Sequence, residues 1–270
     1  MKQGEKRSPR PGKTAFATLV RASAPAPVTM PMTHVTDAYR FRDIMAGGAL
    51  APAPCRIFGS ELVYLFYGRP AYRATAEMES NGSDAYWPIC FVLEPGAVTP
   101  ARIYPFDSGA FHHGRFKAFM HHQMIKEDFE LEIDPSSPGR LLRLFWRDEK
   151  SYFNADGASD FVPDPIDFET KAYRDLISYR GRGNFDERGS AIEIQSEAPV
   201  TLKGNTIAVI LPSEFATDAI VARIEQDFGA LALPFDVVRR HGPTEAVGQI
   251  YTIVRDLLGG AKKDGRGKCW

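Results

Sequence analysis

Three side chains of this 270-residue chain, His34, Arg69 and Glu193, are of the types that bind and cleave a dinucleotide. Each is expected near the end of a separate helix or strand, where distant parts of the chain can meet in one cleft. An Arg guanidinium forms paired hydrogen bonds with phosphate oxygens, and a carboxylate stabilises the positive charge that develops on a ribose during glycosidic cleavage. The set suits a dinucleotide with phosphates and a reactive ribose, and we expect the three side chains to line one concave pocket.

The elements expected around these residues mix helices and strands without regular alternation. His34-Val35-Thr36 opens a short amphipathic helix, capped by Thr36 or Asp37, that stops at Gly47-Gly48. Apolar runs predict buried strands over residues 62–67 and 88–93. Other strands are expected over residues 191–195, 200–202 and 206–211, and helices over residues 110–124, 217–228 and 244–258. This irregular order predicts an α+β fold, a sheet with helices packed around it.

Composition narrows the class of protein. The net charge of -1 excludes a basic signature over the whole molecule, so nucleic acid would have to bind at a local basic groove. The three cysteines are widely spaced and form no CxxC motif, so we expect reduced thiols. No apolar run approaches the roughly 18 residues that a transmembrane helix needs. We therefore expect a cytoplasmic protein without membrane contact.

The ends of the chain differ in composition from its centre. Residues 1–30 are rich in Lys, Arg, Pro and Ala and are expected to form a flexible N-terminal tail. Residues 259–270 are similarly polar and predict a flexible C-terminal tail. No linker divides the stretch between them, so we expect one domain over residues 31–258.

Three ordered pieces of the sequence carry a family resemblance. The first is His34-Val35-Thr36, followed by Ile44-Met45, Gly48 and Leu50. The second runs from Val63 to Arg69-Pro70, and the third from Arg188 through Glu193 to Gln195, with Pro199-Val200 after it. In order and spacing these pieces, about a fifth of the chain, resemble the DarT-like ADP-ribosyltransferase toxins, which modify DNA.

The resemblance implies an ADP-ribosyltransferase-like fold, a single mixed domain with a central split β-sheet and flanking helices. It also implies NAD+ as substrate, no metal, transfer of ADP-ribose to a macromolecular acceptor and release of nicotinamide. DNA or RNA is the favoured acceptor, and a protein acceptor stays open. An enzyme of this kind is toxic to its own cell, which implies an antitoxin protein as a partner.

Residue roles carry over from the resemblance position by position. Glu193 is the catalytic carboxylate, and Arg69 acts with it and binds the pyrophosphate. His34 holds the adenosine-side ribose and is supported by Thr36. Either Tyr64 or Tyr67 is expected to stack on nicotinamide.

Each of these positions also has an ordinary structural explanation. Glu193 lies between Ile192 and Ile194, so it is expected to point away from them, either into an open cleft or simply to the outer face of a half-buried strand. Glu197 competes with it as the working acid. Arg69 beside its proline is also a plausible turn residue.

Other sets of residues suggest weaker alternatives. The histidine pairs at 112–113 and 121–122 could bind a metal with Glu127 or Asp128, but their spacing matches no established zinc pattern. Cys90 could be a nucleophile, although its apolar neighbours favour a buried core thiol. Residues 104–109 form a compact aromatic turn whose Asp-Ser-Gly is common turn chemistry. A local basic patch for nucleic acid is expected to draw on Arg40, Arg42, Arg69, Arg73, Arg115 and Lys117.

Two other functions use the same residues. An NAD+ glycohydrolase would pass ADP-ribose to water, and a non-catalytic binding protein would keep the fold with a decayed site. The first would produce free ADP-ribose without a labelled macromolecule, and the second would release no nicotinamide.

Overall fold

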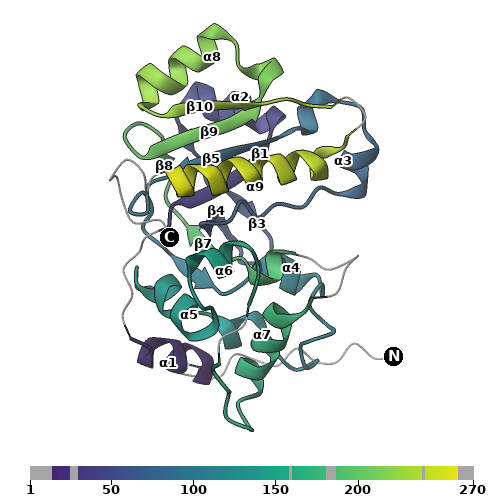
Figure 1. The fold of residues 1–270 in the computed structure, drawn as a ribbon, viewed down its shortest axis with the longest axis vertical. Helices are drawn as coiled ribbons and strands as arrows, with labels where there is room; N and C mark the ends of the chain where they lie inside the picture. The colour runs from purple at the N-terminus through teal and green to yellow at the C-terminus, as the bar shows by residue number, and fades with distance from the viewer. Residues whose placement is uncertain (1–13, 25–29, 158–159, 181–186, 239–240, 261–270) are drawn as a thin grey trace. The chain divides into compact units, whose positions relative to one another are not determined.

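The computed structural model describes residues 14–24, 30–157, 160–180, 187–238 and 241–260 (Figure 1). The chain divides into two compact units, each built from two stretches of sequence. Unit 1 consists of Met1–Val28 and Pro100–Ile194, and unit 2 of Thr29–Thr99 and Gln195–Trp270. The sequence predicted one domain over residues 31–258, whereas the structure divides these residues between the two units. The N-terminal stretch Met1–Val28 belongs to unit 1.

Unit 2 is built on a mixed sheet with the strand order β10-β9-β5-β1-β4, and β3 pairs with β4. These strands are β1 (Met32–Asp37), β3 (Ala53–Cys55), β4 (Ser60–Tyr67), β5 (Pro88–Leu93), β9 (Thr206–Pro212) and β10 (Leu231–Phe235). Only the β9–β10 pair is parallel among the pairings described for this sheet. A separate short ladder joins β2 (Ala49–Leu50) to β8 (Val200–Thr201).

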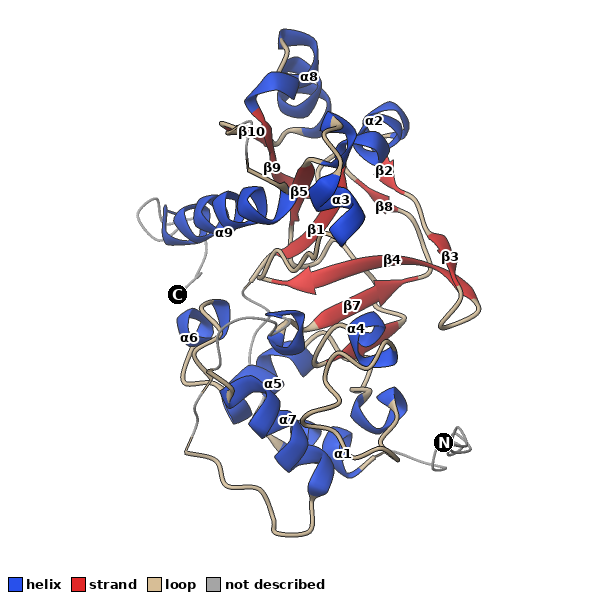
Figure 2. Ribbon diagram, turned by 90° about the vertical axis from the view of Figure 1, so that its right-hand side faces the viewer, coloured by secondary structure: helices blue, strands red, loops and turns tan. Residues whose placement is uncertain are grey.

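Helices cover both faces of this sheet. Helices α2 (Ala38–Gly47) and α9 (Pro243–Gly260) lie on opposite sides of strands β1 and β5, as Figure 2 shows. The other helical segments of unit 2 are α3 (Ala76–Ser80), η1 (Asp84–Tyr86), η4 (Ser213–Phe215), α8 (Asp218–Ala222) and the π-helical η5 (Arg223–Phe228). The central strand β5 is therefore buried along its whole length.

Unit 1 is mainly helical and has a core rich in aromatic rings. Its elements are α1 (Ala15–Ala22), β6 (Arg102–Tyr104), α4 (Ser108–His112), η2 (Lys126–Phe129), α5 (Ser137–Phe145), α6 (Glu149–Phe153), α7 (Phe168–Ser178) and η3 (Glu187–Ser190). Strand β7 (Glu193–Ser196) neighbours β6. The chain passes from unit 1 into unit 2 within this strand, after Ile194. Phe16, Phe129, Phe145 and Tyr173 pack together in the core with ring centroids 4.9–5.9 Å apart.

The structure confirms the α+β class and most of the apolar strands. It confirms the strands over residues 62–67, 88–93 and 206–211 and the final helix. The left-handed stop at Gly48, with φ of 67°, is also confirmed. Within the described residues, no helix is both long and apolar enough to cross a membrane.

The prediction that His34 opens a helix is wrong. Residues 32–37 form β1, and each of them pairs with a residue of β5. The helix begins only at Ala38, where the Asp37 side chain caps it by accepting from the Arg40 N–H at 2.9 Å. Thr33, Val35 and Thr36 are β-branched and favour the extended backbone. Thr36 is therefore a strand residue, and Asp37 is the cap.

Two further predictions need correction in unit 1. The expected helix over residues 110–124 is limited to α4, because the chain turns at Gly114 with φ of 69°. The expected N-terminal tail contains α1, whose Phe16, Ala17 and Val20 are buried. The remaining residues of the tail, 1–13 and 25–29, lie outside the described residues, as do residues 261–270 of the expected C-terminal tail.

Candidate functional site

His34 is held on β1 by a side-chain contact to the neighbouring strand β4. Its Nδ1 lies 2.8 Å from the carbonyl oxygen of Tyr64. Because that oxygen can only accept, Nδ1 carries the proton in the neutral ring and Nε2 is left as an acceptor. Burial of the ring lowers the pKa of His34 from 6.5, and the charge of Arg40 adds to this, against the opposing Tyr64 contact. The imidazole is therefore a neutral hydrogen-bond acceptor near pH 7, which suits a ribose hydroxyl.

Arg69 follows β4 in a turn that is tied to β1. The Thr33 hydroxyl lies 2.6 Å from the Arg69 carbonyl and 3.2 Å from that of Phe66. The preceding Gly68 donates its N–H to the Pro31 carbonyl at 2.7 Å. Gly68 has φ of 69°, and a Cβ there would lie 2.8 Å from the sulfur of buried Met30. The positive φ and this close approach favour glycine in the turn, and the turn sets where the Arg69 side chain begins.

The Arg69 side chain is buried, with only 1% exposed. Its guanidinium carbon lies 6.0 Å from the ring centroid of Tyr251 on α9, at the outer limit of a cation–π contact. Tyr251 could not be predicted, because α9 shows only an ordinary amphipathic pattern and Arg69 is distant from it in sequence.

The two tyrosines expected to stack on nicotinamide differ in exposure. Tyr67 is fully buried, and its hydroxyl accepts from the Met30 N–H at 3.2 Å. Tyr64 is half-buried, and its hydroxyl donates to the Cys55 sulfur at 2.9 Å. Of the two rings, Tyr64 is the one with surface available to a ligand.

Glu193 begins β7 in unit 1 and is 1% exposed. Its two carboxylate oxygens accept from the same residue, Ser108: Oε2 from the backbone N–H at 3.0 Å and Oε1 from the hydroxyl at 2.6 Å. Ile192 and Ile194 are also buried, so this strand has no exposed face at Glu193. The expected half-buried strand with an outward carboxylate is wrong.

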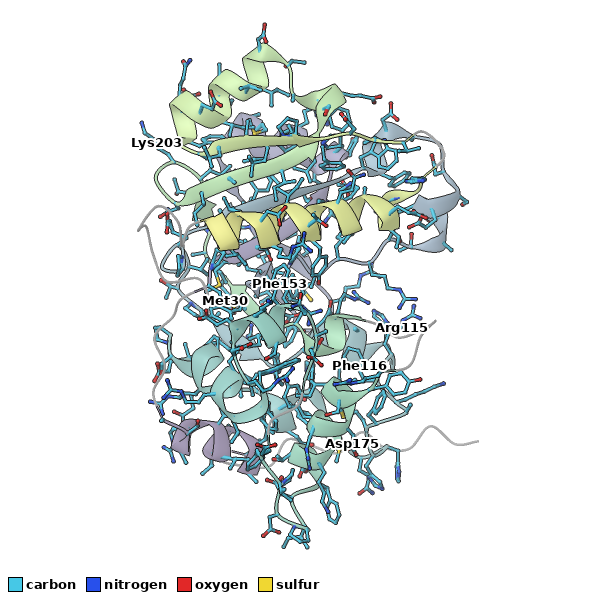
Figure 3. The ribbon with its side chains drawn as sticks, viewed as in Figure 1. Met30, Arg115, Phe116, Phe153, Asp175 and Lys203 are labelled. Atoms are coloured by element: carbon cyan, nitrogen blue, oxygen red, sulfur yellow. The ribbon has the colours of Figure 1, made fainter. Side chains whose placement is uncertain are left out.

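The segment before Glu193 is tied to the same turn as Glu193. Arg188 forms an ion pair with Asp107 at 3.0 Å, and its carbonyl accepts from the Asp107 N–H at 3.1 Å. At Gly189 a Cβ would approach Phe116 and Leu176 to 3.1 Å, so glycine allows this close packing. Phe116 is labelled in Figure 3. The third motif piece is therefore fixed to unit 1 through residues 107–108.

The structure brings together some of the predicted site residues. His34, Thr36, Tyr64, Tyr67 and Arg69 lie in unit 2, on β1, on β4 and in the turn after it. Glu193 belongs to unit 1, where its partner is Ser108. The sequence did not single out Ser108 as a functional residue, although it predicted a turn over residues 104–109.

The residues expected to form a basic patch differ in exposure and in their partners. Arg69 is buried, Arg42 contacts Asp43 and Tyr39, and Arg40 lies 3.9 Å from Asp37. Arg73 is exposed in unit 2. Arg115 and Lys117 are exposed in unit 1, and the Arg115 side chain extends away from the ribbon in Figure 3.

The alternative catalytic sets receive no support from their surroundings. Cys90 is fully buried, and burial raises the pKa of its thiol, as expected of a core residue. Among the described residues, no three His, Cys, Asp or Glu side chains are grouped to hold a metal ion.

A hollow of about 500 Å³ lies elsewhere in unit 2. It is lined by residues of α3, η1, η4 and the start of α9, among them Trp87, Asp84 and Glu214. None of the six predicted site residues lines it.

Comparison with known proteins leaves the family of the chain open. A scan against family models, a search of curated proteins and a search of solved structures each find no match to this chain.

Proposed function

We propose that the chain is an NAD+-dependent ADP-ribosyltransferase that releases nicotinamide and transfers ADP-ribose to a macromolecular acceptor. The observation that carries the proposal is the link between the first two motif pieces. His34 contacts Tyr64 at 2.8 Å, and Thr33 contacts the Arg69 carbonyl at 2.6 Å, so the two pieces lie on adjacent strands. The resemblance assigns both pieces to NAD+ binding.

The residue chemistry fits the roles that we propose. We propose that a neutral His34 presents Nε2 to a ribose hydroxyl. Paired donors from the Arg69 guanidinium to the pyrophosphate require that this side chain, 1% exposed in the structure, becomes accessible to NAD+. When the bond between ribose C1′ and nicotinamide breaks, the bonding electrons leave with nicotinamide and C1′ becomes cationic. In this proposal the Glu193 carboxylate, 1% exposed in the structure, becomes accessible to the ribose, stabilises that cation and accepts the proton of the attacking acceptor group.

Nucleic acid is the acceptor that we favour. Residues 108–126 contain no acidic side chain and carry the exposed Arg115 and Lys117. An acid-free, cationic segment suits a phosphate backbone even in a chain of net charge -1. A toxic activity of this kind would also require an antitoxin protein, which we propose as a partner.

The proposal is tested by incubating the purified chain with NAD+ and mixed acceptors, namely DNA, RNA and protein. We expect nicotinamide release together with a mass increase of one ADP-ribose on nucleic acid, measured by mass spectrometry. Labelled protein alone would change the acceptor class. Free ADP-ribose without any labelled macromolecule would indicate the glycohydrolase, and no nicotinamide release would leave a non-catalytic protein.

The lowered pKa of His34 predicts a pH dependence of stability. Between the folded and unfolded pKa values the unfolded chain binds more protons, so stability rises with pH. The contribution is fully present above the unfolded value of 6.5 and is lost as pH falls through the lowered pKa. His34→Asn keeps a donor toward the Tyr64 carbonyl but cannot titrate.

We therefore expect wild type to lose more stability than His34→Asn between about pH 7.5 and about pH 5. Urea unfolding of both proteins at the two pH values measures the difference. Equal losses would show that the ring is protonated as easily in the folded chain as in the unfolded one.

A further inference from the structure

Ser108 holds the Glu193 carboxylate through two bonds from one residue. The backbone N–H lies 3.0 Å from Oε2 and the hydroxyl oxygen 2.6 Å from Oε1. Both donors point to acceptor oxygens, so the contact suits the ionised carboxylate. Because both oxygens are bound, the plane of the carboxylate cannot rotate without breaking a hydrogen bond.

Ser108 is itself held in place by the chain segment that leads into Glu193. The neighbouring Asp107 receives the Arg188 guanidinium on Oδ2 at 3.0 Å and the Ala110 N–H on Oδ1 at 2.6 Å. The Asp107 N–H donates to the Arg188 carbonyl at 3.1 Å. Residues 107–108 and residues 188–193 are therefore joined at both ends, by two hydrogen bonds at Arg188 and two at Glu193.

Burial makes this arrangement matter for the charge on Glu193. Ser108 is 0% exposed and Glu193 1% exposed, so Ser108 supplies donors that solvent would otherwise provide. Two donors in fixed geometry from one residue therefore take the place of water at both oxygens of this carboxylate.

We propose that Ser108 is a positioning residue: it fixes the orientation and the charge of the Glu193 carboxylate for cleavage of the nicotinamide–ribose bond. This inference rests on the proposed function. Ser108 acts through Glu193 and needs no contact with NAD+.

The test compares three variants by the kinetics of nicotinamide release. Ser108→Ala removes the hydroxyl donor and keeps the backbone donor, whereas Ser108→Thr keeps both. Ser137→Ala is the matched control, because Ser137 is also a buried serine of unit 1 and its hydroxyl donates to the Glu132 carbonyl at 2.9 Å. Thermal melts of all proteins check that the variants are folded.

We expect Ser108→Ala to lower kcat by roughly 10- to 100-fold with little change in KM, because a misplaced group slows the chemical step. Ser108→Thr should recover most of kcat, and Ser137→Ala should retain it. An unchanged kcat in Ser108→Ala, or equal losses in Ser108→Ala and Ser137→Ala, would overturn the positioning role.

A second readout follows Glu193 itself. The carbon-13 signal of its carboxyl group, assigned by its loss in Glu193→Gln, should move in Ser108→Ala and stay in place in Ser137→Ala. An unmoved signal in Ser108→Ala would overturn the proposal even if the threonine variant fails to fold. Wild type that releases no nicotinamide would instead overturn the proposed function, while the carbon-13 result would still show whether Ser108 holds the carboxylate.

Discussion

Glu193→Gln is expected to slow nicotinamide release and acceptor labelling by roughly 10²- to 10⁴-fold, the range for loss of a general base. The amide keeps the size of the side chain but has no negative charge to stabilise a cationic ribose. It also cannot accept the proton of the acceptor group. Rates of both processes in wild type and variant measure the effect.

The same substitution is also expected to lower the free energy of unfolding by about 1–3 kcal/mol. A carboxylate in an open cleft, one of the positions that the sequence allowed, would change stability little on this substitution. In the structure Glu193 is 1% exposed and both oxygens accept from Ser108. An amide can accept at only one end, so one Ser108 donor meets an NH₂ group.

Glu197→Gln provides the matched control, because Glu197 is exposed four residues along the chain. We expect that variant to keep both activity and stability. Full activity in Glu193→Gln with loss of activity in Glu197→Gln would transfer the catalytic role to Glu197. If Glu193→Gln loses its cooperative unfolding transition, Glu193 is a structural residue and the catalytic assignment has no support.

Phe16→Ala is expected to destabilise the chain by about 3–5 kcal/mol, as usual when a buried phenylalanine is truncated. Phe16 on α1 is fully buried, and its ring centroid lies 5.5 Å from Phe129, 5.9 Å from Phe145 and 5.4 Å from Tyr173. Removing the ring leaves a cavity among side chains from three other segments. Urea unfolding of wild type and variant measures the loss.

Phe168→Ala is the control for this prediction, since Phe168 lies in the same unit but is 59% exposed. Its truncation should change stability by less than about 0.5 kcal/mol. If residues 1–30 were a flexible tail throughout, Phe16→Ala would behave like Phe168→Ala. Equal stabilities of the two variants would thus reject the packing of α1.

The sequence predicted elements well where burial dominates the local pattern. Residues 62–67 of β4, the whole of β5 and residues 207–211 of β9 are continuous apolar runs, so these strands are predictable without knowledge of their partners. The prediction from sequence was wrong at β1, because the polar residues of His34-Val35-Thr36 resemble the start of a helix. The deciding factor there is pairing with β5, more than fifty residues away in sequence.

The candidate site was predictable in its residue types but not in its contacts. The prediction that the Glu193 carboxylate is exposed assumed that its strand has one face open to solvent, as strands with alternating residues often do. Ser108, which holds the carboxylate, is 85 residues distant in sequence and begins α4 within an Asp-Ser-Gly sequence whose residue types are common in loops. A hydrogen bond between residues so distant in sequence leaves no periodic pattern along the chain. The contact between Arg69 and the ring of Tyr251 leaves none either.

The division of unit 1 into two stretches of sequence has a consequence for biosynthesis. Helix α1 is made before α5 and α7, which cover it, and Thr29–Thr99 of unit 2 is made in between. Throughout that interval α5 and α7 cannot bury Phe16, Ala17 and Val20. The nascent chain thus carries a helix with an uncovered apolar face, which is the kind of segment that chaperones bind during translation.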